Sequence, residues 1–179
     1  MWLLNAKTLQ LEDASDESRR PPYAILSHRW RAAEVSFVEL AERRELRERV
    51  EQKFGFLKLA DRREKLGYTK IRNCCDVVRS HFNLDYVWID TCCIDKRNSA
   101  DLSEAINSMY TWYERSAVCV VYLDDVEVPE SESFDSHDWV TALSDSEWLK
   151  RGWTLQELVA SKSRSFYGIG QKWAHAIQT

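Results

Sequence analysis

The chain has 179 residues, 44% of them hydrophobic and 30% charged, with a formal net charge of −4. This length and composition are typical of one globular domain with its own core, and the small negative charge favours neither nucleic acid nor an anionic membrane as a partner. No apolar run approaches the roughly 20 residues that span a bilayer, and the N-terminus lacks the features of a signal peptide. Five cysteines, including two adjacent pairs, form no disulfide framework. We therefore expect a cytoplasmic protein in a reducing compartment.

The first third of the chain combines short apolar runs with a long charged segment. Residues 1–22 begin with apolar residues and end in a polar stretch closed by two prolines, which predicts a leader strand or arm and a loop. Tyr23–Leu26 is a short apolar run and predicts a buried strand. Residues 36–66 are rich in Glu, Arg, Leu and Phe and predict helices. Their interleaved charges favour a solvated face over a nucleic-acid patch.

Helical and strand patterns alternate through the middle of the chain. Apolar residues at helical spacing predict a helix over Tyr68–His81. Two apolar runs predict strands over Tyr86–Ile89 and over Ala117–Leu123, the second closed by Asp124 and Asp125. Between these strands, Asp101 and Glu104 resemble a capping pair at the start of a helix whose apolar face runs to Tyr113.

The last third carries weaker signals. Residues 127–138 are acidic and rich in serine, and we expect a surface loop there. Ser144 and Glu147 resemble another capping box, and Ser165–Tyr167 predicts a fourth strand.

This alternation predicts βαβ units and an α/β fold with a mainly parallel sheet. Right-handed crossovers place the ends of successive parallel strands at the same edge of the sheet. We therefore expect residues 27–30, 90–96 and 124–125 to lie together although they are distant in the sequence.

Trp153 and Glu157 are four residues apart and are expected to share one helix face, with Leu155, Leu158 and Val159 packing on the sheet from another side. A carboxylate in a crevice can stabilise a cationic transition state or hold sugar hydroxyls, and an indole stacks on a flat ring. The alternative is a surface glutamate beside a half-buried tryptophan.

Ser27, His28, Arg29 and Trp30 follow the first predicted strand. An arginine at a strand end can clamp a phosphate, and His28 can act as an acid or base or donate a hydrogen bond. The alternative is a polar turn that leaves the sheet. A glycine-rich phosphate loop of the dinucleotide-binding or P-loop kind is missing from the sequence.

Asp90, Cys92 and Cys93 follow the strand predicted over Tyr86–Ile89. Either cysteine can act as a nucleophile with His28 as base and Asp90 as the group that orients it. The alternative is that both thiols are small buried apolar groups. We expect no metal site, because the sequence has no Cys-x-x-Cys pair and its four histidines are scattered.

Three ordered segments together resemble the fungal heterokaryon-incompatibility (HET) domain. They are Tyr23–Trp30, then Tyr86–Lys96 continuing through Ser103–Tyr113, then Trp148–Leu158 followed by Phe166-Tyr167. The resemblance covers nearly the whole chain, from Tyr23 to Trp173. It divides the sequence into an N-terminal arm, 1–22, and a single domain, 23–179. Arg31 departs from the pattern, because many relatives have glycine after the tryptophan of the first segment.

The resemblance implies a TIR-like, flavodoxin-like fold, with a mainly parallel sheet flanked by helices, and a role in non-self recognition and regulated cell death. Many TIR domains cleave NAD with a glutamate placed after a tryptophan, as Glu157 is placed after Trp153. Glu157 is therefore the candidate catalytic residue. The implied substrate-binding residues are Ser27, His28, Arg29, Trp30, Asp90, Cys92, Arg151 and Trp153. Arg29 and Arg151 would pair with the pyrophosphate, and Trp30 or Trp153 would stack on a base.

The leading hypothesis is thus an NAD glycohydrolase, with NAD as substrate and no cofactor or metal. A non-catalytic, oligomerising signalling module is the second hypothesis, and a hydrolase that uses Cys92 or Cys93 is the third. The first two predict self-association, and an upstream protein or domain is expected to activate the chain. The sequence fits a family core, a short natural form or a trimmed piece equally well.

Overall fold

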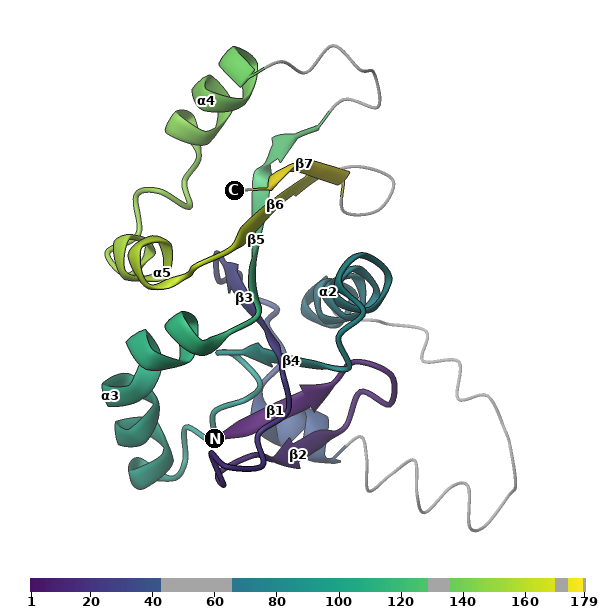
Figure 1. Cartoon of the computed structure of the whole chain (residues 1–179), viewed down its shortest axis with the longest axis vertical. Coiled ribbons are helices and arrows are strands. Elements are labelled where there is room, and N and C mark those ends of the chain that lie inside the picture. The colour runs from purple at the N-terminus through teal and green to yellow at the C-terminus, as the bar shows by residue number, and fades with distance from the viewer. Residues whose placement is uncertain (43–65, 129–135, 170–173, 179) are drawn as a thin grey trace, which may run out of the picture.

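The computed structural model describes residues 1–42, 66–128, 136–169 and 174–178 (Figure 1). Residues 37–42 are helical, as expected. The remainder of the helical prediction, over 43–65, lies outside the described residues.

A seven-stranded sheet in the order β2-β1-β4-β3-β5-β6-β7 organises the molecule. The four central strands, β4, β3, β5 and β6, are parallel, whereas β1, β2 and β7 pair antiparallel at the two edges. The strands are β1 (Trp2–Asn5), β2 (Leu11–Asp13), β3 (Ala24–His28), β4 (Tyr86–Ile89), β5 (Val118–Glu127), β6 (Arg164–Ile169) and β7 (Ala174–Gln178). The expected α/β class is confirmed. In chain order the parallel strands run 2-1-3-4, as in a flavodoxin-like sheet.

Helices cover both faces of this sheet. They are α2 (Leu66–Phe82), α3 (Ser99–Arg115), α4 (Ser136–Asp145) and α5 (Thr154–Ala160). Figure 1 shows α2 on one face and α3, α4 and α5 on the other. The chain therefore changes faces after β4, and the switch point lies between β3 and β5, where open α/β sheets bind ligands at the carboxyl ends of their strands.

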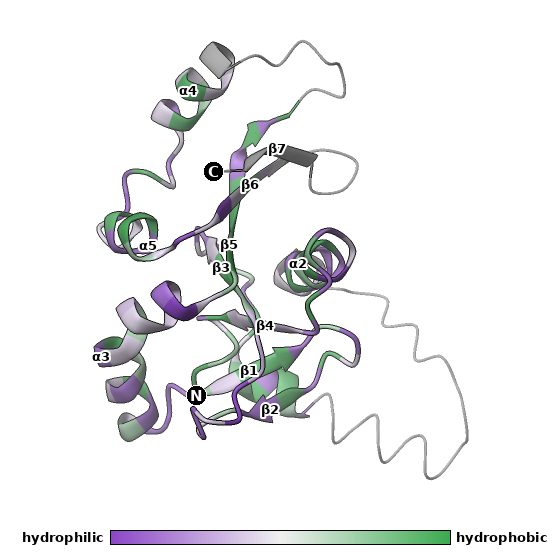
Figure 2. Ribbon diagram, in the orientation of Figure 1, coloured by the Kyte–Doolittle hydropathy of each residue, from purple (hydrophilic) through white to green (hydrophobic). Residues whose placement is uncertain are grey.

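The core follows from this double cover. Every residue of β3 is buried, because a central strand with helices on both faces has no solvent side. Trp88 on β4 is fully buried and meets Trp112 of α3 edge to face, with ring centroids 5.4 Å apart. Figure 2 shows hydrophobic residues along the central strands and mixed polarity on α2, as expected for a helix with one face on the sheet.

Several boundaries differ from the sequence predictions. The N-terminal segment forms β1 and β2 and adds to the sheet, since β1 pairs with β4. Strand β5 runs on to Glu127, so Asp124 and Asp125 lie inside it, and its register against β6 shifts after Tyr122. Gly168 permits this irregularity, because a Cβ there would lie 2.4 Å from the Val126 carbonyl oxygen.

Both predicted capping boxes are wrong. Helix α3 begins after Asn98, whose side chain accepts a hydrogen bond from the Ala100 amide, so Asp101 and Glu104 are already helical. Ser144 lies near the end of α4 and donates to the Val140 carbonyl. Residues 136–138, expected in a loop, begin α4, and 129–135 lie outside the described residues.

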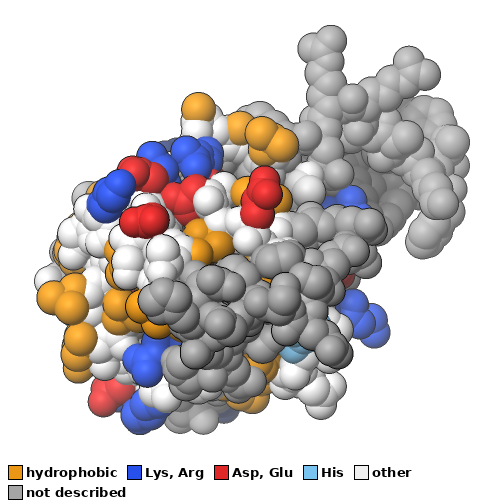
Figure 3. Space-filling view, turned by 90° about the horizontal axis from the view of Figure 1, so that it is seen from above, with side chains coloured by type: hydrophobic (Ala, Val, Ile, Leu, Met, Phe, Trp, Pro, Cys, Tyr) orange, Lys and Arg blue, Asp and Glu red, His pale blue; other side chains and the backbone are white. Residues whose placement is uncertain are grey.

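Charge on the described surface is mixed. On the face in Figure 3, acidic and basic side chains lie among one another and among hydrophobic ones. In the described part of the chain, no helix is both long and apolar enough to cross a membrane.

Candidate functional site

The carboxyl end of β3 points side chains to both faces of the sheet. Ser27 contacts Glu157 of α5, whereas His28 contacts Lys70 of α2 on the opposite face. This alternation follows from the two-residue period of a strand. Two polar clusters therefore meet at one strand end, beside the switch point.

The first cluster surrounds Glu157, which is 4% exposed. The Ser27 hydroxyl donates to Oε2 of this carboxylate, and the Trp148 indole donates to the Ser27 oxygen over 2.8 Å. Nη2 of Arg151 lies 3.4 Å from the other carboxylate oxygen, Oε1. A hydroxyl and a guanidinium thus hold the buried carboxyl in one orientation.

Burial has the largest effect on the pKa of the Glu157 carboxyl. Loss of solvent raises the pKa of Glu157 above its ordinary value, and the nearby Arg151 charge and the Ser27 hydrogen bond only partly oppose that rise. A raised carboxyl pKa in a crevice is typical of functional sites.

The phase of α5 explains why a glutamate is buried. Thr154 donates its hydroxyl to the Trp148 carbonyl over 2.6 Å and is itself buried. Residues 154, 157 and 160 then face the sheet, since they repeat about once per turn.

The second cluster surrounds Asp90, at the end of β4. Nε2 of His28 lies 3.1 Å from one carboxylate oxygen, and the Trp30 indole donates to the other over 2.8 Å. Burial alone would raise the pKa of Asp90, but the hydrogen bonds from His28 and Trp30 outweigh burial and lower the pKa. Asp90 is therefore a fixed anion at neutral pH.

Lys70 determines which ring nitrogen of His28 carries the proton. The Lys70 ammonium lies 3.1 Å from Nδ1 and has only donors, so Nδ1 accepts and Nε2 carries the hydrogen that is donated to Asp90. The same ammonium donates to the Glu34 carboxylate and, over 3.1 Å, to the Arg29 carbonyl. One chain of contacts thus joins Glu34, Lys70, His28 and Asp90 across the sheet edge.

Trp30 is the accessible part of this second cluster. It is 52% exposed, its indole nitrogen is fixed by Asp90, and the Lys96 ammonium lies 4.1 Å from a ring centroid. The site therefore presents one oriented aromatic ring to solvent.

Comparison with known proteins identifies the family. The model of the family described as "Heterokaryon incompatibility protein (HET)" matches residues 23–135, which is more than half of the chain. The chain belongs to the HET family.

One curated relative, "Vegetative incompatibility protein HET-E-1" of Podospora anserina, is 42% identical over 149 residues. The alignment covers 82% of this chain and 10% of the relative, so the chain spans about a tenth of that protein's length. No solved structure matches. Ser27, His28 and Asp90 lie inside the range matched by the family model, and Glu157 lies beyond it.

The predicted site residues of this HET domain fall into two groups. Ser27, Arg151 and Glu157 form one cluster, and His28, Trp30 and Asp90 form the other. The expected convergence of strand ends is observed, and Arg31 adds a contact to Asp124. Arg29 lies at the rim, 3.8 Å from Glu147, with its side chain 32% exposed.

Trp153 does not accompany Glu157. It is 52% exposed at the N-terminal boundary of α5, while Glu157 faces inward. Of the three residues expected on the sheet, Leu158 packs against the core, whereas Leu155 and Val159 are 70% and 64% exposed. Trp153 and Glu157 were expected to share a helix face, but Thr154 is held against the Trp148 carbonyl, so residues 154, 157 and 160 turn toward the sheet and Trp153 turns away.

Cys92 and Cys93 lie in the core of the HET domain, with exposures of 0% and 2%. The neighbouring Cys93 thiol and burial raise the pKa of Cys92 far above its ordinary value. A buried neutral thiol is a poor nucleophile, so this geometry does not support the cysteine-dependent mechanism, and Cys92 has no surface with which to contact a substrate.

Three residues of the clusters were missed in the sequence. Trp148, rather than Trp153, supplies the indole near Glu157, and Glu34 and Lys70 complete the second cluster. Lys70 did leave a signal, because it lies on the buried face of α2 beside Ile71 and Cys74, where an unpaired lysine is very costly. Within the described ranges, no group of three or more His, Cys, Asp or Glu is placed to hold a metal ion.

Proposed function

We propose that this chain acts in heterokaryon incompatibility and regulated cell death as an NAD glycohydrolase. Membership of the HET family and the name of the relative, a vegetative incompatibility protein, support the biological role. The observation that carries the chemistry is the Glu157 carboxyl, oriented by Ser27 and Arg151 beside the switch point of the sheet.

The reaction requires little beyond this carboxylate. The bond between C1′ of the ribose and the nicotinamide nitrogen breaks, and its electron pair neutralises the pyridinium ring. The ribose left behind resembles an oxocarbenium ion, which an anion stabilises. Water then forms a bond to C1′ and releases a proton, giving nicotinamide and ADP-ribose. Glu157 in its ionised form would supply the stabilising charge.

The other residues would bind the substrate. Nη1 of Arg151 is buried and has no hydrogen-bond partner among the described residues, so it is available to a phosphate or ribose oxygen. Trp30 offers a half-exposed indole for stacking on a base. Arg29, at the rim, would pair with the pyrophosphate after its side chain leaves Glu147.

The test is nicotinamide release from NAD by the purified domain and by Glu157→Gln, which keeps the shape and removes the charge. Glu114→Gln is the matched control, because Glu114 is an exposed glutamate of α3, the helix on the same face of the sheet as α5. We expect release by the wild type and Glu114→Gln only. Equal release by Glu157→Gln would exclude Glu157 as the catalytic group.

A second function is favoured by the outer face of α5. Trp153, Leu155 and Val159 are all more than half exposed, and helices seldom display such residues without a partner. This face suits the alternative of a non-catalytic module that signals by self-association or by binding an upstream activator. Cell death caused by Glu157→Gln, but not by a variant with charged residues on α5, would support that alternative.

A further inference from the structure

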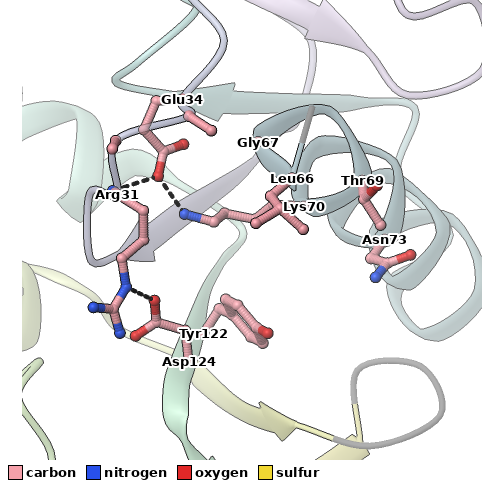
Figure 4. Close-up of a pocket in the computed structure, with 11 residues that line it drawn as sticks. Arg31, Glu34, Leu66, Gly67, Thr69, Lys70, Asn73, Tyr122 and Asp124 are labelled. Atoms are coloured by element: carbon pink, nitrogen blue, oxygen red, sulfur yellow. Dashed lines mark hydrogen bonds and ion pairs between the residues drawn. The ribbon is translucent and has the colours of Figure 1, made fainter. Parts of the chain in front are cut away.

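A cavity of about 480 Å³ lies on the α2 side of the sheet, and Glu157 is not part of its lining (Figure 4). Its walls are the loop after β3, the first turns of α2 and the strand β5. The size is that of a small-molecule site. Because Ser27 and His28 point to opposite faces, this cavity is separate from the carboxyl of the proposed reaction.

A close backbone contact shapes the cavity. The Gly67 amide donates to the Ala33 carbonyl over 3.1 Å, and a Cβ at Gly67 would lie 2.3 Å from that oxygen. Only glycine allows α2 to begin this close to the loop.

The charges in the cavity are already matched. Lys70 uses its three donors on Glu34, His28 and the Arg29 carbonyl, so no donor remains for a ligand. Arg31 is paired with Asp124 (Figure 4). Two cations and two anions cancel, so the interior favours a neutral ligand over a phosphate.

The polar atoms of the lining that are still able to bind a ligand are mainly hydrogen-bond acceptors and neutral polar groups. Oε2 of Glu34 and Oδ1 of Asp124 accept no hydrogen bond from the described residues, and the side chains of Thr69 and Asn73 make none with them. Thr69 and Asn73 are one helical turn apart on α2, and Tyr122 contributes an aromatic ring from β5 (Figure 4). Such a lining suits a flat ring that also carries hydroxyl or amino donors.

We propose that this cavity is a binding site for a neutral nucleoside, distinct from the NAD-cleaving site. The base packs against Tyr122 and the apolar wall of Ala32, Ala33 and Leu66. Ribose hydroxyls or an exocyclic amino group donate to the carboxylates of Glu34 and Asp124, and Asn73 and Thr69 bond the polar edge of the base.

Calorimetric titration with adenosine tests the proposal without requiring activity. Thr69→Trp fills the cavity, and Asn73→Leu keeps the size of the side chain and removes its hydrogen bonds. Arg79→Trp is the matched control, because Arg79 is exposed in the last turn of the same helix. We expect adenosine to bind the wild type, Arg79→Trp and Glu157→Gln alike, and to bind the two cavity variants roughly tenfold more weakly or not at all.

Three results would overturn the proposal. One is no binding of adenosine to the wild type up to its solubility limit. Another is undiminished binding to both Thr69→Trp and Asn73→Leu, which would place the nucleoside elsewhere. The third is loss of binding in Glu157→Gln alone, which would assign the nucleoside to the crevice of the proposed reaction. Because binding is measured directly, failure of NAD cleavage leaves this test intact.

Discussion

Glu157 combines burial with a charged partner, and the balance between them controls its protonation. Burial raises its pKa above the ordinary 4.5, despite Arg151 and Ser27. The proposed chemistry needs the ionised form, so NAD cleavage should fall as pH is lowered, with a midpoint above 4.5. The pH profile of kcat/KM for NAD checks this expectation. A rate that stays constant down to the ordinary pKa of glutamate would contradict it.

The same shift predicts a pH dependence of stability. A carboxyl with a pKa raised by folding binds protons more tightly in the folded state, so its stabilising effect is complete below 4.5 and is lost as pH rises through the raised pKa. The wild type should therefore gain stability relative to Glu157→Gln as pH is lowered from neutral. Urea unfolding of both proteins over a pH series measures the difference in their free energies of unfolding. The other titrating groups are common to both proteins, so their contributions cancel in this difference. A constant difference would contradict the raised pKa.

Lys70 is the buried cation on which the second cluster depends. Lys70→Met leaves the Glu34 carboxylate without its ammonium partner and frees the ring of His28, and removing one member of a buried pair costs about 3 kcal/mol. Lys150→Met removes a surface partner of Glu147 and should change the free energy of unfolding much less, because water screens an exposed pair. Urea unfolding compares the two variants, and similar losses would show that the Lys70 pair is no stronger than a surface pair.

At the scale of single elements, helix α3 shows where local sequence signals mislead. Asp101 and Glu104 have capping-box spacing, but Asn98 supplies the cap, with an Oδ1 to Ala100 amide distance of 3.0 Å. Asn98→Ala should destabilise the domain by about 1 kcal/mol in urea unfolding. Asn107→Ala, an exposed position within α3, is the control and should change the free energy of unfolding little. Equal effects would contradict the assigned cap.

Helix α5 presents Leu155 and Val159 outward because Thr154 and Glu157 face the sheet. If this outer face mediates self-association, Leu155→Glu should lower the sedimentation coefficient of the associated protein toward that of the monomer. Leu66→Glu is the control, since Leu66 is a comparably exposed leucine on α2, across the sheet. Association that survives Leu155→Glu would assign the interface to another surface.

For the molecule as a whole, strong apolar periodicity predicted the centre of the fold. Tyr86–Ile89 is a strand with the predicted bounds, and α2 extends the predicted helix by two residues at its start and one at its end. A leader strand was predicted near β1 only as an alternative to an arm, and β2 lies in the stretch predicted to be a loop. Short half-buried strands depend on pairing partners that the sequence does not name. The extension of β5 through Asp124 was missed for the same reason, since pairing with β6 overrides local polarity.

The sequence predicted which strand ends form the candidate site, but not which side chains contact one another there. The parallel sheet implied that Ser27, His28 and Asp90 would lie at the carboxyl ends of neighbouring strands. His28 does contact Asp90, whereas Ser27 points to the other face and contacts Glu157. The side-chain partners depend on helix phase, and this separates Trp153 from Glu157 and brings in Trp148. Lys70 and Glu34 join through a long-range ion pair, which no local pattern reports.

Nicotinamide release from NAD tests the central claim most directly. The measurement uses the purified domain at high concentration, and again after fusion to a dimerising partner, so that a need for self-association does not conceal activity. We predict that nicotinamide accumulates with the wild type in at least the fused form and that Glu157→Gln abolishes it in both. No release from the wild type in either form would contradict the glycohydrolase and favour the non-catalytic assembly module.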